Sequence, residues 1–98
     1  MEKPVKKNIV EVLEQKFTIS NKLGLHARPA ALLVQTANQF QSDITIQKGK
    51  QKVNGKSIMG VMMLAAGLGS HVVVRISGPD ARKAMQAIAK LFQQNFQE

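Results

Sequence analysis

A seven-residue stretch, GLHARPA, at positions 24–30 contains the residue types best suited to chemistry. A neutral histidine ring such as that of His26 can act as a nucleophile and carry a transferred group. The guanidinium of Arg28 can pair with phosphate oxygens. If a helix begins near Ala27, its unpaired backbone N–H groups and its dipole favour an anion, and Pro29 is tolerated in the first turn. The stretch suits a site that receives a phosphoryl group, although the residues alone leave open that His26 is a helix cap or a surface side chain.

Composition disfavours several other kinds of site. The sequence contains no cysteine, so it has no disulfide, no thiolate nucleophile and no thiolate metal site. Its two histidines are far apart and neither belongs to a cluster with carboxylates, so we expect no metal and no cofactor. No serine or cysteine nucleophile and no carboxylate pair stands beside His26, so we do not expect a hydrolase.

The hydropathy of the chain predicts its location. No apolar run approaches the ~20 residues that a membrane-spanning helix requires. The N-terminal segment, MEKPVKKNIVEVLEQ, is charged and interrupted by Glu11 and Glu14, whereas a secretory signal has an uninterrupted apolar region. We therefore expect a cytoplasmic protein without a membrane partner.

Basic residues exceed acidic ones, with 14 Lys and Arg against six Asp and Glu and a formal net charge of +8. The segment QKGKQKVNGK, which predicts two strand ends around a turn at Gly49, carries four of the lysines: Lys48, Lys50, Lys52 and Lys56. These lysines are either a solvated hairpin or a contact surface for an acidic or phosphate-bearing partner. Nucleic acid is the less favoured partner, because the chain has no Tyr or Trp and its four Phe lie at core-like positions.

The periodicity of apolar residues predicts an α+β fold. Strand-like alternation covers residues 16–20, 43–47 and 71–77, and helical spacing runs from about Ala27 to residues 38–40 and again after Asp80. A shorter apolar piece begins at Ser57. The order β-α-β-β-α-β-α predicts an open-faced β-sandwich, in which a four-stranded, mainly antiparallel sheet is covered on one face by two longer helices and one short helix. Residues 1–14 are expected to form a disordered or loosely packed extension, or a short amphipathic segment, before a single domain over residues 15–98.

Three segments resemble one known family in order and spacing: NKLGLHARPAALLVQTA, NGKSIMGVMML and GLGSHVVVRISGPDARKAMQAIAKLF, which together span about residues 15–96. The chain is similar to HPr, the histidine-containing phosphocarrier family of the bacterial phosphoenolpyruvate-dependent phosphotransferase system. The resemblance implies that His26 takes a phosphoryl group on Nδ1 from phosphorylated enzyme I and passes it to an enzyme IIA domain. It implies that Arg28 neutralises charge and that the backbone of Ala27, Arg28 and Pro29 forms a phosphate cradle. Such a protein is a carrier rather than an enzyme.

The second segment, NGKSIMGVMML, resembles a regulatory site of the same family. The resemblance implies that Ser57 is the serine that an ATP-dependent HPr kinase/phosphorylase modifies, and that Ile58, Met59 and Met62 form an apolar docking patch. Methionine suits a surface that must accept several partners. The residues alone favour a plain N-cap for Ser57.

Some features leave alternatives open. Leu23 stands where many family members carry a small polar residue, and the phrasing NKLGLHARPA is similar to the nitrogen-type branch, which acts in regulation rather than in sugar uptake. The alternatives are therefore a regulatory phosphorelay protein that acts mainly by docking, or a basic binding module in which His26 is a helix cap. We expect His71 to be an exposed bystander, and a carrier that meets successive partners to be a monomer.

Overall fold

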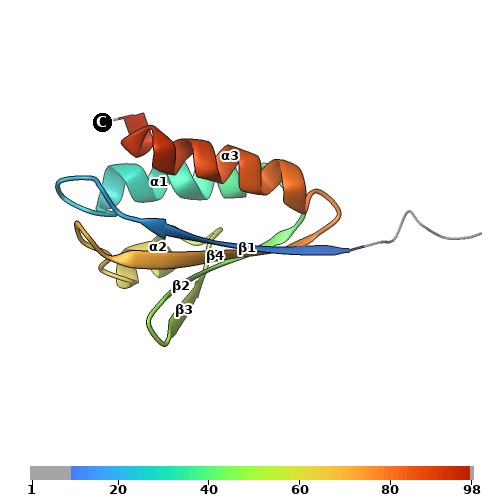
Figure 1. Cartoon of the computed structure of the whole chain (residues 1–98), viewed down its shortest axis with the longest axis horizontal. Helices are drawn as coiled ribbons and strands as arrows, with labels where there is room; N and C mark the ends of the chain where they lie inside the picture. Colours follow the sequence, from blue (N-terminus) through green and yellow to red (C-terminus); the bar gives the residue numbers. More distant parts are fainter. Residues whose placement is uncertain (1–9, 98) are drawn as a thin grey trace, which may run out of the picture.

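A four-stranded antiparallel sheet with helices on one face forms the protein, as seen in a computed structural model that describes residues 10–97 (Figure 1). The strands lie in the order β1-β4-β2-β3. The elements along the chain are β1 (Glu11–Thr18), α1 (Ala27–Ala37), β2 (Asp43–Lys48), β3 (Gln51–Asn54), α2 (Ile58–Met63), β4 (His71–Gly78), α3 (Ala81–Gln93) and a short turn over Asn95–Gln97. The predicted fold and element order are confirmed.

The first strand begins at Glu11, which corrects the expected extension over residues 1–14. Glu11 pairs with Gly78 at one end of the β1–β4 ladder, and Thr18 pairs with His71 at the other. The alternation of this strand is hard to recognise in the sequence, because β1 is an edge strand and its valine, Val12, is exposed. Leu13 is partly buried and packs against the core. The part of the expected extension over residues 1–9 lies outside the described residues.

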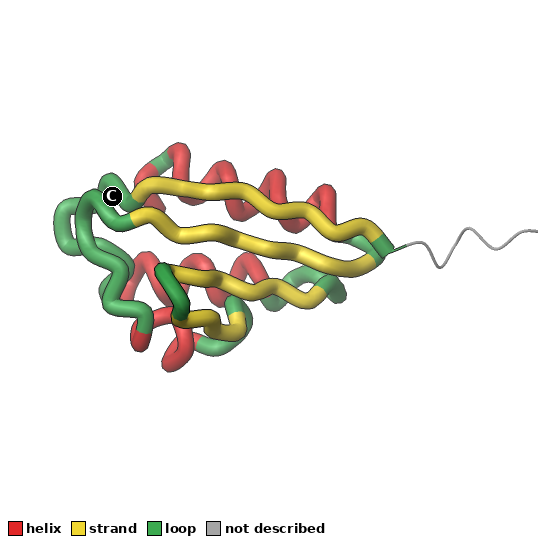
Figure 2. The backbone as a smooth tube through the Cα atoms, turned by 60° about the horizontal axis from the view of Figure 1, so that its bottom comes forward, coloured by secondary structure: helices red, strands yellow, loops and turns green. Residues whose placement is uncertain are grey.

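The helices lie on one face of the sheet (Figure 2), and buried apolar residues from both layers form one core. Strands contribute alternate residues, such as Val72, Val74 and Ile76 of β4, and each of these is fully buried. Phe17 of β1 stacks on Phe92 of α3 with ring centroids 4.2 Å apart. Phe96 packs edge-on against the same ring at 4.9 Å. Three of the four phenylalanines are therefore in the core rather than on a surface where bases could stack.

The start of α3 is tied to the start of β2 through Asp80. Its carboxylate accepts hydrogen bonds from the backbone N–H and hydroxyl of Ser42, at 3.0 and 2.5 Å, and from the backbone N–H of Gln41 at 2.9 Å. The Ser42 hydroxyl, followed by the Gln41 N–H, lowers the pKa of Asp80 below its usual 3.8. At this end of the sheet the Asp80 carboxylate is therefore satisfied by hydrogen bonds from Gln41 and Ser42.

Among residues 10–97, no helix is both long enough and apolar enough to cross a membrane.

Candidate functional site

His26 stands at the N-cap of α1, where the sequence placed it. Its backbone is extended, and its carbonyl accepts the first helical hydrogen bond from Ala30 N–H at 3.0 Å. The residue is half-buried, whereas Ala27 and Arg28 in the first turn are exposed. Within the described part of the chain, the His26 side chain makes no capping hydrogen bond to the helix. His26 therefore differs from a usual N-cap residue, whose side chain accepts a hydrogen bond from the first turn.

The first turn of α1 begins with two exposed residues, Ala27 and Arg28. N–H groups at a helix start have no intrahelical acceptor, so those of Ala27 and Arg28 can donate hydrogen bonds to an anion. The first turn contains no acidic side chain to compensate the positive end of the helix dipole. Pro29 has no N–H and is buried, so it anchors the helix on the core and cannot itself donate to an anion.

The loop before His26 fits closely against the segment that follows α2. Gly24 has φ +69°, and a Cβ atom there would lie 2.4 Å from the carbonyl oxygen of Ala66 and 2.7 Å from Cα of Gly67. Leu25 N–H donates to the same Ala66 oxygen at 2.8 Å. Only glycine provides both the left-handed backbone and the close approach at position 24. This contact fixes the chain immediately before the histidine.

A shallow pocket of about 260 Å³ is lined in part by His26. Its walls are apolar side chains and backbone from the preceding loop and the end of α2: Leu23, Leu25, Met62, Ala65, Ala66 and Gly67. Arg28 is not among these lining residues, and instead lines a neighbouring pocket with Leu32, Gln35 and Phe96. The structure therefore joins His26 to Met62 in one hollow, and it places the Arg28 side chain on the adjoining surface.

Ser57 is the N-cap of α2, and its hydroxyl is used by that helix. The Oγ atom accepts a hydrogen bond from Gly60 N–H at 3.0 Å, and the Ser57 carbonyl accepts from Val61 N–H at 3.0 Å. The capping role that the sequence favoured for this serine is confirmed. The residue is half-buried, and the exposed Ile58 and Met59 follow it directly.

The exposed apolar side chains near the site outnumber those that the sequence singled out. Ile58, Met59 and Met62 are exposed, as a docking role requires. Three further large apolar side chains in this part of the molecule are more than half exposed: Leu23, Met63 and Leu68. In the sequence Leu23 stands out as a departure from the family pattern, and an apolar residue in a polar loop next to the histidine is itself an indication of a contact surface.

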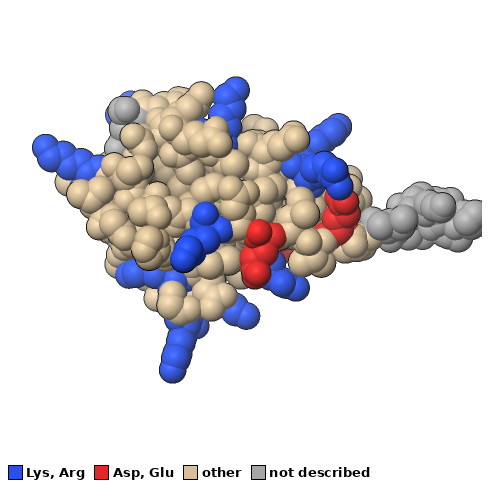
Figure 3. All heavy atoms as spheres, in the orientation of Figure 1, with Lys and Arg blue, Asp and Glu red and all other residues tan. Residues whose placement is uncertain are grey.

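The lysine-rich segment is a β2–β3 hairpin with its turn at Gly49, as predicted. Two of its four lysines serve the fold: Lys48 Nζ donates to the carbonyls of Leu64 and Ala65, and Lys56 Nζ donates to the carbonyl of Phe40 at 2.7 Å. Lys and Arg side chains occur at several separate places on the visible surface (Figure 3). The hairpin is therefore not a uniform cationic contact surface.

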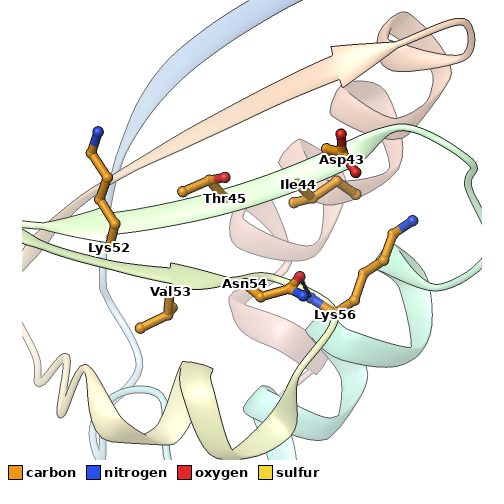
Figure 4. Close-up of a pocket in the computed structure, with 7 residues that line it drawn as sticks. All are labelled: Asp43, Ile44, Thr45, Lys52, Val53, Asn54 and Lys56. Carbon is orange, nitrogen blue, oxygen red and sulfur yellow. Dashed lines mark hydrogen bonds between the residues drawn. The ribbon is translucent and has the colours of Figure 1, made fainter.

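A second hollow lies over β2 and β3 and is lined by Asp43, Ile44, Thr45, Lys52, Val53, Asn54 and Lys56. In Figure 4 the side chains of Lys52 and Lys56 stand at opposite ends of the hollow. The Asn54 side chain accepts from Lys56 N–H at 2.8 Å, so its oxygen is engaged within the hairpin. These groups do not converge on a common ligand.

His71 is exposed at the start of β4, as expected. Its Nδ1 lies 3.0 Å from the hydroxyl of Thr18 on the neighbouring strand. Residues 10–97 contain no group of three or more His, Cys, Asp or Glu side chains that could hold a metal ion.

The fold and the site together define a class of small α+β protein in which a histidine begins a helix whose first residues, Ala27 and Arg28, are exposed. A model of the PTS-HPr family, described as the PTS HPr component phosphorylation site, matches residues 13–94. The chain therefore belongs to the HPr family of the phosphotransferase system.

Known members resemble the chain over nearly its whole length. The phosphocarrier protein HPr of Xylella fastidiosa strain Temecula1 is 53% identical over 87 residues, which cover 89% of this chain and 98% of the relative. A crystal structure of HPr-C-His from Thermoanaerobacter tengcongensis superposes with a TM-score of 0.85 at 46% identity, over 88% of this chain and 97% of that one. An HPr dimer solved from the same organism has a TM-score of 0.72 at 48% identity, over 84% of this chain and 94% of that one.

Proposed function

We propose that this phosphocarrier of the phosphotransferase system receives its phosphoryl group on Nδ1 of His26, from phosphorylated enzyme I, and delivers it to an enzyme IIA domain. The observation that carries the assignment is the start of α1. A half-buried imidazole is followed there by an exposed first turn without acidic side chains. Family membership and the phosphocarrier relatives support the same function.

The chemistry requires one bond to form as another breaks. The lone pair of neutral His26 attacks the phosphorus, and the bond between the phosphorus and enzyme I breaks with its electrons returning to the donor. The Ala27 and Arg28 N–H groups stabilise the phosphoryl oxygens. The exposed guanidinium of Arg28 neutralises part of their charge. Because Ala27 and Arg28 are exposed, their N–H groups bind the phosphoryl group only moderately. Delivery uses the same kind of step: a group on the enzyme IIA domain attacks the phosphorus, and the bond between phosphorus and His26 breaks with its electrons returning to the imidazole.

Exposed apolar side chains beside His26 supply the docking surface for both partners. Met62 lines the His26 pocket, and Ile58 and Met59 are exposed on the same helix. A partner that covers α2 therefore also covers the histidine and excludes water from the transfer. We propose that the protein acts as a monomer, and light scattering in solution tests this, since a dimer at working concentration would contradict it.

Ser57 is the proposed regulatory site for an HPr kinase/phosphorylase. A phosphoryl group on its oxygen adds about −1.5 to −2 charge at the start of α2, where the helix dipole tolerates it. Ile58 and Met59 follow immediately, so the charge would stand at the edge of the docking surface. We expect it to weaken binding of an acidic partner through repulsion rather than to unfold the helix.

Incubation with phosphoenolpyruvate and catalytic enzyme I tests the assignment. Intact mass should show one acid-labile phosphoryl group on wild type and on Ser57→Ala, and none on His26→Ala. Absence of labelling on wild type, or labelling of His26→Ala, would contradict the proposal. A subsequent chase with IIA domains of the sugar-transport and nitrogen-type branches identifies the branch by which acceptor removes the label.

A further inference from the structure

The carbonyl groups at the end of α2 receive donors from the β2–β3 hairpin, which packs beside this helix (Figure 1). Lys48 Nζ lies 3.1 Å from the oxygen of Leu64 and 3.3 Å from that of Ala65. Gln51 Nε2 lies 3.4 Å from the oxygen of Met63. The last carbonyls of a helix have no intrahelical donor, and a cation suits the negative end of the helix dipole. The last turn of α2 has no basic residue, so the hairpin supplies that charge.

The segment that Lys48 holds leads directly to the His26 loop. Ala65 has φ +49°, a left-handed conformation that a non-glycine residue keeps only when its surroundings enforce it. The next carbonyl, that of Ala66, accepts the Leu25 N–H at 2.8 Å and packs against Gly24. A movement of residues 64–66 would therefore shift the backbone on which His26 stands.

We propose that Lys48 is a positioning residue for phosphoryl transfer. Its ammonium fixes the end of α2 and residues 64–66, and so sets the spacing between the docking residue Met62 and His26 within their shared pocket. The expected effect on phosphoryl transfer rests on the proposed function. The expected effect on the backbone of the His26 loop rests on the geometry alone. Lys48 thus differs from both roles that the sequence left open for the hairpin lysines, a solvated side chain and a contact surface for a partner.

Matched variants of the full chain separate this role from a loss of surface charge. Lys48→Met keeps an unbranched stem and removes the donors, whereas Lys48→Arg restores a cation that can donate to carbonyls. Lys50→Met removes the same charge from the same hairpin at an exposed position, and Lys50 makes no side-chain hydrogen bond within residues 10–97. Amide hydrogen exchange of Leu25 gives a local readout. The Ala84 N–H, which donates a hydrogen bond to the backbone carbonyl of Asp80 at the far end of the sheet, is the internal reference.

We expect the Leu25 amide to exchange about ten-fold faster in Lys48→Met, with Ala84 unchanged, and to be near wild type in Lys50→Met and Lys48→Arg. The KM of enzyme I for the carrier should be about five-fold higher for Lys48→Met than for wild type, with kcat nearly unchanged, because docking geometry rather than chemistry is affected. Equal acceleration of Leu25 and Ala84 would indicate a general loss of stability and overturn the proposal. An unchanged Leu25 amide, or faster exchange with an unchanged KM, would overturn it as well. If enzyme I labels no variant and not the wild type, the proposed function fails, while hydrogen exchange still decides whether Lys48 positions the loop.

Discussion

Two helix starts carry the two candidate phosphorylation positions, and they are built differently. At α2 the Ser57 hydroxyl accepts the Gly60 N–H at 3.0 Å, so the capping side chain serves the helix. At α1 the His26 side chain makes no such bond within residues 10–97, and the first-turn residues Ala27 and Arg28 are exposed. The same structural position therefore supplies a capping side chain at α2 and, at α1, the histidine that we propose as the phosphoryl acceptor.

The difference shows how a helix start can be kept available for an anion without losing its place in the fold. The α1 start is held from the sides rather than by its own cap: Pro29 is buried beneath it, and Gly24 and Leu25 are fixed against Ala66. The α2 start depends on local capping. Substitutions that act on these separate supports should therefore affect the two helices differently.

The largest effect is expected from Gly24→Ala, which removes the lateral support of α1. The new Cβ would lie 2.4 Å from the Ala66 oxygen in a left-handed backbone, so we expect a loss of about 3 kcal/mol in unfolding free energy. Gly60→Ala in α2 is the matched control. Its Cβ would lie 3.3 Å from Cβ of Val53, a tight contact that requires a small shift of that side chain, whereas helix propensity favours alanine, so a loss below about 1 kcal/mol is expected. Urea denaturation measures both, and equal losses would show that α1 has no special lateral support.

A smaller effect is expected from Ser57→Ala, which removes the cap of α2. The loss of the Oγ bond to Gly60 should cost about 1 kcal/mol of unfolding free energy, while Ser57→Thr should keep most of it. Phosphoryl uptake from enzyme I should persist in both variants, because neither change reaches the α1 start. A strong reduction of uptake in Ser57→Ala would mean that the two helix starts are not independent.

The smallest effect concerns the third helix start, at Asp80. Its pKa is lowered by the Ser42 hydroxyl and the Gln41 N–H, so its stabilising contribution is present above the unfolded value of 3.8 and is lost as pH falls through the lower folded value. Asp80→Asn should therefore lower the Tm at neutral pH, and the gap to wild type should narrow below about pH 4. A gap that stays constant on acidification would show that the carboxylate charge is not what Ser42 and Gln41 stabilise.

The parts of the fold that depend on local pattern could be predicted. The element order, the start of α1 at Ala27, the hairpin turn at Gly49 and the cap at Ser57 all follow from periodicity and from residues with known local preferences. The start of β1 at Glu11 could not, because an edge strand with an exposed Val12 lacks clean alternation.

Contacts between distant parts of the chain could not be predicted from the sequence either. Lys48 appeared as one of four similar lysines, and only the folded chain places it against carbonyls 16 and 17 residues away. Asp80 was expected to begin a helix, which it does, but its carboxylate serves Ser42 on another segment. The exposure of Leu23 and Met63 likewise depends on the packing of the folded chain, because the core is formed by other apolar residues.

The central claim is that the open start of α1 accepts the phosphoryl group at one nitrogen of one histidine. Its most direct test is an NMR measurement of phosphorus–nitrogen coupling in uniformly ¹⁵N-labelled protein, phosphorylated by enzyme I and phosphoenolpyruvate. We predict coupling at Nδ1 of His26 and at no other side-chain nitrogen. A phosphoryl group on Nε2, on His71 or on Ser57 would contradict the account.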